Sequence, residues 1–141
     1  MDQVAIEVLA RSMRRAIEGL PQETLPFHMR DFPRCWCTDA SLLLGAFLSD
    51  KRFGGFELIR GWRGSQSHAW LAKDDLIIDI TADQFPDAPL GMLITKPSSW
   101  HEQFEVEGCP EPGDFREQCG PGIDNLRILY SQLHPALFDK A

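Results

Sequence analysis

Hydrophobic residues recur at helical spacing over the first part of the chain. Within residues 3–19 the apolar positions fall mostly three or four residues apart, which is the pattern of an amphipathic helix. Gly19 and Pro21 follow this stretch, and both residue types favour the end of a helix. We therefore expect a helix over residues 3–19, and then an extended loop over residues 21–36, which contains three prolines.

A second apolar pattern begins near Cys37 or Thr38. Thr38 and Asp39 suit the first turn of a helix, because their side-chain oxygens interact favourably with the free amide groups there. We expect this helix to end near Ser49–Asp50. Its apolar face consists of Ala40, Leu43, Leu44, Phe47 and Leu48.

The middle of the chain has the composition of β-strands. Three short runs, at residues 56–62, 67–73 and 76–81, are rich in β-branched and aromatic side chains. Between the last two runs, Lys73-Asp74-Asp75 fits a tight hairpin turn. The pattern predicts an antiparallel meander.

Prolines and glycines are frequent over residues 82–121, which predicts irregular structure over the core with a short strand at residues 91–95. A final helix is expected over residues 123–134, ended by Pro135, because proline lacks an amide hydrogen. These elements predict one domain, residues 1–141, of the α+β class, with helices at both ends.

The composition is that of an ordinary globular domain. The 141 residues are 43% hydrophobic and 25% charged, enough for a core without disulfides or metal. The net charge of −7 argues against nucleic acid as a partner, since phosphate binding requires a basic patch. We interpret Arg11, Arg14 and Arg15 as the solvated face of the first helix.

The chain has no run of 18 apolar residues and no apolar segment after a basic N-terminus, so neither a membrane span nor a secretory signal is expected. Four cysteines are too few for a disulfide scaffold. We expect a cytoplasmic protein with free thiols, which leaves a cysteine available for chemistry.

Cys37 lies where the loop is expected to become a helix. Free amide groups and the helix dipole favour thiolate over thiol there, and the same amides can bind an oxyanion. His68 begins one predicted strand and Asp79 lies in the next, among isoleucines, where a carboxylate needs a partner. Thiolate, imidazole and carboxylate together form a nucleophile, a base and an orienting group.

Within such a hairpin, the contact between His68 and Asp79 is the part of the predicted site that is hardest to form. Strict two-residue pairing places Asp79 opposite a residue near Leu71–Lys73, so the contact requires a longer reach, strand twist or a bulge. Asp83 is the alternative partner for His68.

The blocks Cys37-Thr38-Asp39-Ala40-Ser41, His68-Ala69-Trp70 and Asp79-Ile80-Thr81 resemble the papain-like cysteine hydrolases, specifically their transglutaminase-like branch. Residues 77–85 also look like a signature of small bacterial proteins of this type. The resemblance covers roughly residues 32–85. It implies a nucleophile helix packed on a small antiparallel sheet, with Cys37 as nucleophile, His68 as general base and acid, and Asp79 as orienting residue.

The resemblance implies hydrolysis or acyl transfer at an amide or ester carbonyl, by peptidase, deamidase or transglutaminase-type chemistry, without a cofactor. The expected substrate is a protein or peptide, with a small amide as an alternative. Cys35, which precedes a tryptophan, is the alternative nucleophile, because a Cys-Trp pair occurs at nucleophiles of this superfamily.

Two other hypotheses remain open. In the first, a metal is held by thiolates and an imidazole, although no Cys-x-x-Cys pair is present; the candidate ligands are Cys35, Cys37, His68, Cys109 and Cys119. In the second, the fold is a non-catalytic binding module with an aromatic groove formed by Trp62, Trp70, Trp100 and Phe104. For the remaining loop histidines, His28 and His101, the sequence indicates no partner.

Overall fold

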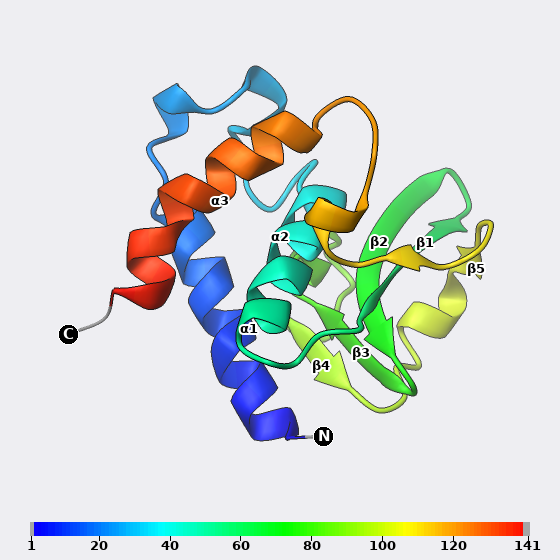
Figure 1. The fold of residues 1–141 in the computed structure, drawn as a ribbon. Coiled ribbons are helices and arrows are strands. Elements are labelled where there is room, and N and C mark those ends of the chain that lie inside the picture. Colours follow the sequence, from blue (N-terminus) through cyan, green and yellow to red (C-terminus); the bar gives the residue numbers. More distant parts are fainter. Residues whose placement is uncertain (1, 140–141) are drawn as a thin grey trace.

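The computed structural model describes residues 2–139, in which three α-helices pack against an antiparallel sheet (Figure 1). The helices are α1 (Gln3–Glu18), α2 (Cys37–Asp50) and α3 (Ile123–Phe138). The strands are β1 (Glu57–Arg63), β2 (Gln66–Lys73), β3 (Leu76–Asp79), β4 (Leu93–Thr95), β5 (Glu105–Val106) and β6 (Glu111–Pro112). Short 3₁₀ helices lie at Gln22–Thr24, Phe27–Met29, Ala82–Gln84, His101–Gln103 and Phe115–Glu117. The α+β class and the antiparallel meander expected from the sequence are confirmed.

Helix α2 lies between the sheet and the other two helices (Figure 1). Every residue from Ala40 to Leu48 is buried, because a helix that is apolar on all sides must be covered on all sides. Helices α1 and α3 cover the side of α2 that faces away from the sheet. The helix begins at Cys37 and ends at Asp50, as the sequence predicts.

The sheet has the order β4-β3-β2-β1-β5, and β6 also pairs with β1. Strands β2 and β3 form a hairpin in which Lys73 pairs with Leu76, so Asp74 and Asp75 make a two-residue turn. Asp74 has a positive φ of 55°, which such tight turns require. The turn therefore lies where the sequence predicts it.

The two faces of the sheet belong to different clusters of buried side chains. On β2, Ala69 and Leu71 face the main core with α2, while Trp70 points to the other face, because alternate residues of a strand point to opposite sides. The segment after β3 covers that second face. Its buried cluster contains Trp70, Ala82, Phe85, Leu93, Trp100 and Phe104.

Helix α3 is longer than the sequence predicts: it continues through Pro135 to Phe138. A proline inside a helix removes one helical hydrogen bond and its ring crowds the carbonyl group four residues earlier, and packing of the last turn outweighs that cost. Leu137 is buried, and the ring of Phe138 lies 5.3 Å from that of Phe47.

The interpretation of Arg14 as a solvated residue was wrong. Its guanidinium group donates hydrogen bonds to the carbonyl oxygens of Ile80 (3.0 Å) and Gly91 (3.1 Å) and to the carboxylate of Asp83 (2.6 Å). Arg14 therefore attaches α1 to the segment that follows β3.

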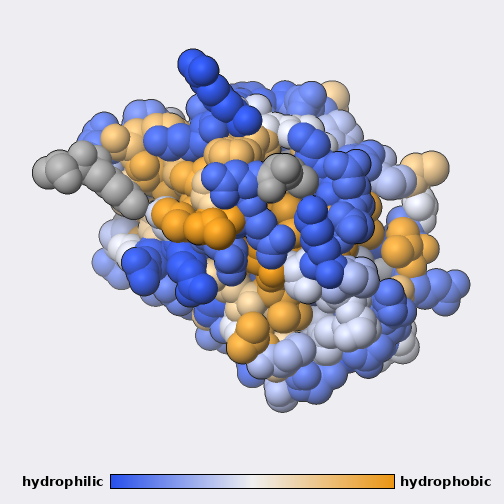
Figure 2. Space-filling view, turned by 90° about the horizontal axis from the view of Figure 1, so that it is seen from below, coloured by the Kyte–Doolittle hydropathy of each residue, from blue (hydrophilic) through white to orange (hydrophobic). Residues whose placement is uncertain are grey.

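The face of the molecule seen in Figure 2 carries hydrophobic residues in patches separated by hydrophilic ones. No helix within residues 2–139 is long and apolar enough to cross a membrane.

Candidate active site

Cys37 is the first residue of α2, and the residues before it fix its position. Trp36 is fully buried, and its indole N–H donates to the carbonyl oxygen of Met29 (2.8 Å). The first amide that reaches a helical carbonyl is that of Ala40, which bonds Trp36 O at 2.7 Å. The amides before it, at the start of the helix, have no partner within the helix and are free to stabilise negative charge.

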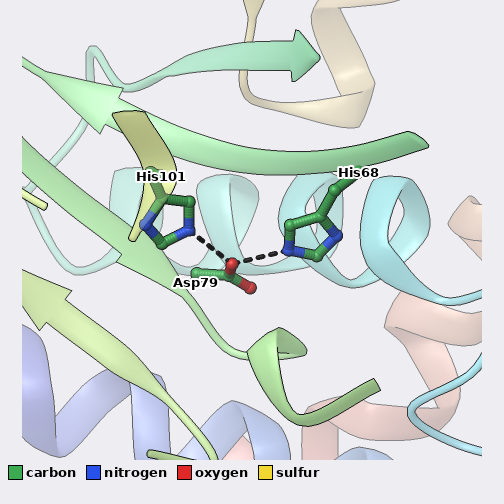
Figure 3. A group of neighbouring side chains, drawn as sticks. All are labelled: His68, Asp79 and His101. Atoms are coloured by element: carbon green, nitrogen blue, oxygen red, sulfur yellow. Dashed lines mark hydrogen bonds and ion pairs between the residues drawn. The ribbon is translucent and has the colours of Figure 1, made fainter. Parts of the chain in front are cut away.

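His68 and Asp79 meet across the β2–β3 hairpin. Leu71 pairs with Ile78, so the same register places Asp79 opposite Trp70, one residue nearer to His68 than the stretch Leu71–Lys73 expected from the sequence. His68 and Asp79 are thus diagonal neighbours on one face of the sheet, close enough for their side chains to meet. His68 Nε2 lies 2.6 Å from Asp79 Oδ2, and both side chains are buried (Figure 3). The diagonal placement supplies the reach that the sequence left in question.

Asp83, the alternative partner of His68, is directed elsewhere. Both of its carboxylate oxygens accept hydrogen bonds from Arg14. The structure therefore brings Asp79 to His68 and Asp83 to α1.

The Asp79 carboxylate also accepts from groups that the sequence did not point to. His101 Nε2 lies 2.7 Å from Oδ2, the same oxygen that His68 contacts (Figure 3). The other oxygen, Oδ1, accepts from the Thr81 amide at 3.0 Å and lies 3.5 Å from its hydroxyl group. A carboxylate with 1% exposure is thus surrounded by donors, which favours its ionised form.

His101 lies on the 3₁₀ helix between β4 and β5, 22 residues from Asp79 in sequence. Its other ring nitrogen contacts the hydroxyl group of Ser98. No periodicity or spacing in this loop-rich stretch indicates the contact with Asp79, so sequence reasoning missed this histidine.

Gln84 is the second residue that sequence reasoning missed. Its side-chain nitrogen lies 2.7 Å from His68 Nδ1, the ring nitrogen opposite to the one that contacts Asp79. Gln84 also acts on Cys37, because its side-chain amide lowers the pKa of that thiol. A signal existed, because Gln84 lies within the block of residues 77–85 that carries the resemblance.

The charged forms of Cys37 and His68 stabilise each other. Burial alone raises the pKa of the Cys37 thiol, but the hydrogen bond and charge of His68, with further hydrogen bonds from Gln84 and the Ala69 backbone, hold it below its ordinary value. Burial alone lowers the pKa of His68, yet Asp79 and Cys37 raise it to about 9. The arrangement favours a Cys37 thiolate beside a His68 imidazolium.

The pKa of Asp79 lies below its ordinary value. Burial raises it, and the hydrogen bonds from His101 and His68 more than offset that effect. Asp79 is therefore a carboxylate over the neutral pH range.

An open cleft of about 170 Å³ gives access to Cys37. Exposed Trp62, whose indole N–H donates to the Glu107 carboxylate, forms part of its wall. The cleft is lined by Cys37, Thr38, Arg60, Gly61, Trp62, Ser67, His68, Ala69 and Glu107.

The cysteines of the alternative metal site, which include the alternative nucleophile Cys35, do not form a buried cluster as His68 and Asp79 do. Cys35, Cys109 and Cys119 are exposed free thiols, and among residues 2–139 the group of possible metal ligands is His68, Asp79 and His101, within 4.8 Å of one another. Both imidazoles of that group already contact one carboxylate oxygen as hydrogen-bond partners.

The aromatic residues considered for a binding groove are mostly interior. Trp70, Trp100 and Phe104 are buried in the second cluster around His68, and Trp62 is exposed beside the cleft. Their main contribution is therefore a dry, rigid surrounding for His68 and Asp79.

Comparison of the chain with models of protein families, with curated proteins and with solved structures finds no match.

Proposed function

We propose that this protein is a cysteine-dependent hydrolase or acyltransferase that acts on an amide or ester carbonyl, with a papain-like core of the transglutaminase-like type. Cys37 is the nucleophile, His68 the general base and acid, and Asp79 the residue that orients His68. The observation that carries the proposal is the position of buried His68, whose Nε2 lies 2.6 Å from Asp79 Oδ2 and which lines the same cleft as Cys37.

The reaction follows from these positions. The Cys37 thiolate forms a bond to the carbonyl carbon, and the carbonyl oxygen gains negative charge, which the free amides at the start of α2 can stabilise. As the tetrahedral intermediate collapses, the bond to the amine or alcohol breaks, and His68 gives its Nδ1 proton to that leaving group. The product of this half is a thioester on Cys37.

In the second half, His68 takes a proton from water or from an acceptor amine. The oxygen or nitrogen of that acceptor forms the new bond to the acyl carbon, and the sulfur leaves as a thiolate. Hydrolysis and transfer differ only in the acceptor. We propose a protein or peptide substrate with a small amide as the alternative, action in the cytoplasm, and no cofactor.

The test is the pH dependence of Cys37 alkylation by iodoacetamide, resolved by site with mass spectrometry. Exposed Cys35, Cys109 and Cys119 serve as internal controls in the same tube. Since an ordinary thiol titrates at about pH 8.5, we expect Cys37 at pH 6 to react at least about tenfold faster than these three. In His68→Ala, Cys37 should fall to the rate of the controls.

Equal reactivity of all four cysteines in the wild type would contradict the proposal and would favour a non-catalytic binding module. An excess of Cys37 reactivity would be followed by p-nitrophenyl acetate, which should acylate Cys37 in a burst that Cys37→Ser abolishes and Cys35→Ser retains.

A further inference from the structure

We propose that His101 is a positioning residue of this site, a fourth member that acts on Cys37 through Asp79 and His68. The inference rests on the proposed function and adds a residue to it. His101 has no contact with the cleft that opens at Cys37, so its effect must pass through the Asp79 carboxylate.

The positions of the protons support this role. An ionised carboxylate only accepts hydrogen bonds, so each imidazole nitrogen that lies 2.6 or 2.7 Å from Asp79 Oδ2 must carry a hydrogen. His68 and His101 therefore both donate from Nε2 to one oxygen. This contact requires the Nε2–H form of a neutral His68, so Nδ1, which Gln84 Nε2 approaches to 2.7 Å, is the nitrogen that exchanges a proton with Cys37.

The surroundings of His101 hold its ring in the donating orientation. Ser98 contacts Nδ1 on the far side of the ring, and the Ser98 hydroxyl oxygen accepts from the His101 amide at 3.2 Å. The rings of Trp70 and Trp100 lie 4.7 and 4.9 Å away. His101 is 4% exposed, so bulk water does not compete for Asp79 from this side.

Of the charged groups near His101, Asp79 is the one that forms a hydrogen bond with its side chain. Asp75 and Glu102 line a pocket beside His101, and Asp75 is paired with Lys96 at 3.9 Å. On the inner side, His68 faces Asp79 and Cys37. A donor from His101 keeps Asp79 ionised and its Oδ2 directed at His68, which supports the imidazolium and, in turn, the Cys37 thiolate.

The experiment measures the alkylation profile of Cys37 in His101→Leu, His101→Gln and the wild type. Loss of the donor in His101→Leu should move the acid limb of the Cys37 profile upward by about one pH unit, the size of one hydrogen bond to a charged group. At pH 6 this is about a tenfold loss of rate. His101→Gln, whose amide can donate to Asp79, should recover part of the shift.

The matched control is His134→Leu, which removes an exposed histidine on α3 and should leave the profile unchanged. A purely structural role for His101 would lower the melting temperature of His101→Leu without moving the midpoint of the profile. That result in a folded variant, shown by circular dichroism, would overturn the inference.

A second measurement needs no variant at all. In the ¹⁵N–¹H spectrum of wild-type imidazoles, His68 and His101 should both show a protected Nε2–H, and both signals should shift when Cys37 is alkylated. A His101 ring protonated only at Nδ1 would overturn the inference. Its failure is distinct from failure of the proposed function, which shows as ordinary wild-type Cys37 reactivity.

Discussion

At the scale of single residues, Asp79 has two roles: it stabilises the fold, and in the proposed reaction it orients His68. Its two oxygens accept from His68, His101 and Thr81, and it is almost fully buried. Removing one partner of a buried, hydrogen-bonded charge leaves the others unsatisfied. The same carboxylate that would orient the base therefore also holds β3 to the segment that covers it.

We expect Asp79→Asn to destabilise the fold by about 3 kcal/mol at pH 7, as for other broken buried pairs. The pKa of Asp79 is lowered in the folded protein, so its contribution is present above the unfolded pKa of about 4 and is lost as the pH falls below it. Urea unfolding from pH 3 to pH 7 should show a smaller loss on acidification in Asp79→Asn than in the wild type. Equal slopes would exclude a stabilising carboxylate at this position.

Gln84 offers a second test at this scale. Its amide nitrogen lies 2.7 Å from His68 Nδ1, and the same amide helps to hold the pKa of the Cys37 thiol low. Gln84→Leu should raise that pKa and slow Cys37 alkylation at pH 6 by about tenfold, the value of one hydrogen bond to a charged group. Gln132→Leu, on the exposed side of α3, is the control. An unchanged rate would mean that Gln84 contributes nothing to the thiolate.

The sequence indicates three residues of the candidate site and misses two, His101 and Gln84. Cys37, His68 and Asp79 could be grouped because each lies on an element with a clear pattern. His101 lies in a stretch rich in proline and glycine, where no periodicity shows the path of the chain. Its contact depends on how that stretch folds back over the sheet, which is a tertiary property.

At the scale of elements, the position of α2 depends on a close approach of two backbones. A methyl group on Gly45 would lie 1.8 Å from the carbonyl oxygen of Gly113, far inside contact distance. Only glycine lets the segment before Asp114 pack this tightly on the helix. The pattern of apolar residues predicts the bounds of α2, but it does not reveal this contact, because Gly113 lies 68 residues further along the chain (113 − 45).

Gly45→Ala should destabilise the fold by about 3 kcal/mol, at the upper end for overpacked cores, because rigid backbone rather than a flexible side chain must move. Thermal unfolding measures the loss. Gly19→Ala is the control, since a methyl group there meets only ordinary contacts at 3.5 and 3.6 Å. Similar melting temperatures for the two variants would show that the backbones separate at little cost.

At the scale of the whole molecule, Arg14 links the N-terminal helix to the site. It donates to Ile80 O, to the Asp83 carboxylate and to Gly91 O, on both sides of the 3₁₀ helix that contains Gln84. The amphipathic pattern predicts α1, but it places all arginines on the solvent face. Only the packed structure shows that one of them is mostly covered, with 16% side-chain exposure.

Arg14→Met keeps the aliphatic part of the side chain and removes the donors. We expect a loss of about 2 kcal/mol in stability, because two carbonyl oxygens and a carboxylate lose hydrogen bonds. Cys37 alkylation at pH 6 should also slow, as Gln84 loses its support. Arg11→Met, on the exposed side of the same helix, should change neither quantity. A stability loss with normal Cys37 reactivity would confine Arg14 to a structural role.

The two-residue turn between β2 and β3 has a consequence for how such a site tolerates change. His68 and Asp79 lie on the same hairpin, so the pairing register alone decides whether they share a face. A slip of one residue turns every side chain of one strand to the opposite face. A residue inserted at Asp74-Asp75 that shifts the register would therefore turn either His68 or Asp79 to the opposite face and separate base from carboxylate. The length of this turn therefore matters to the site as much as the identity of its polar residues.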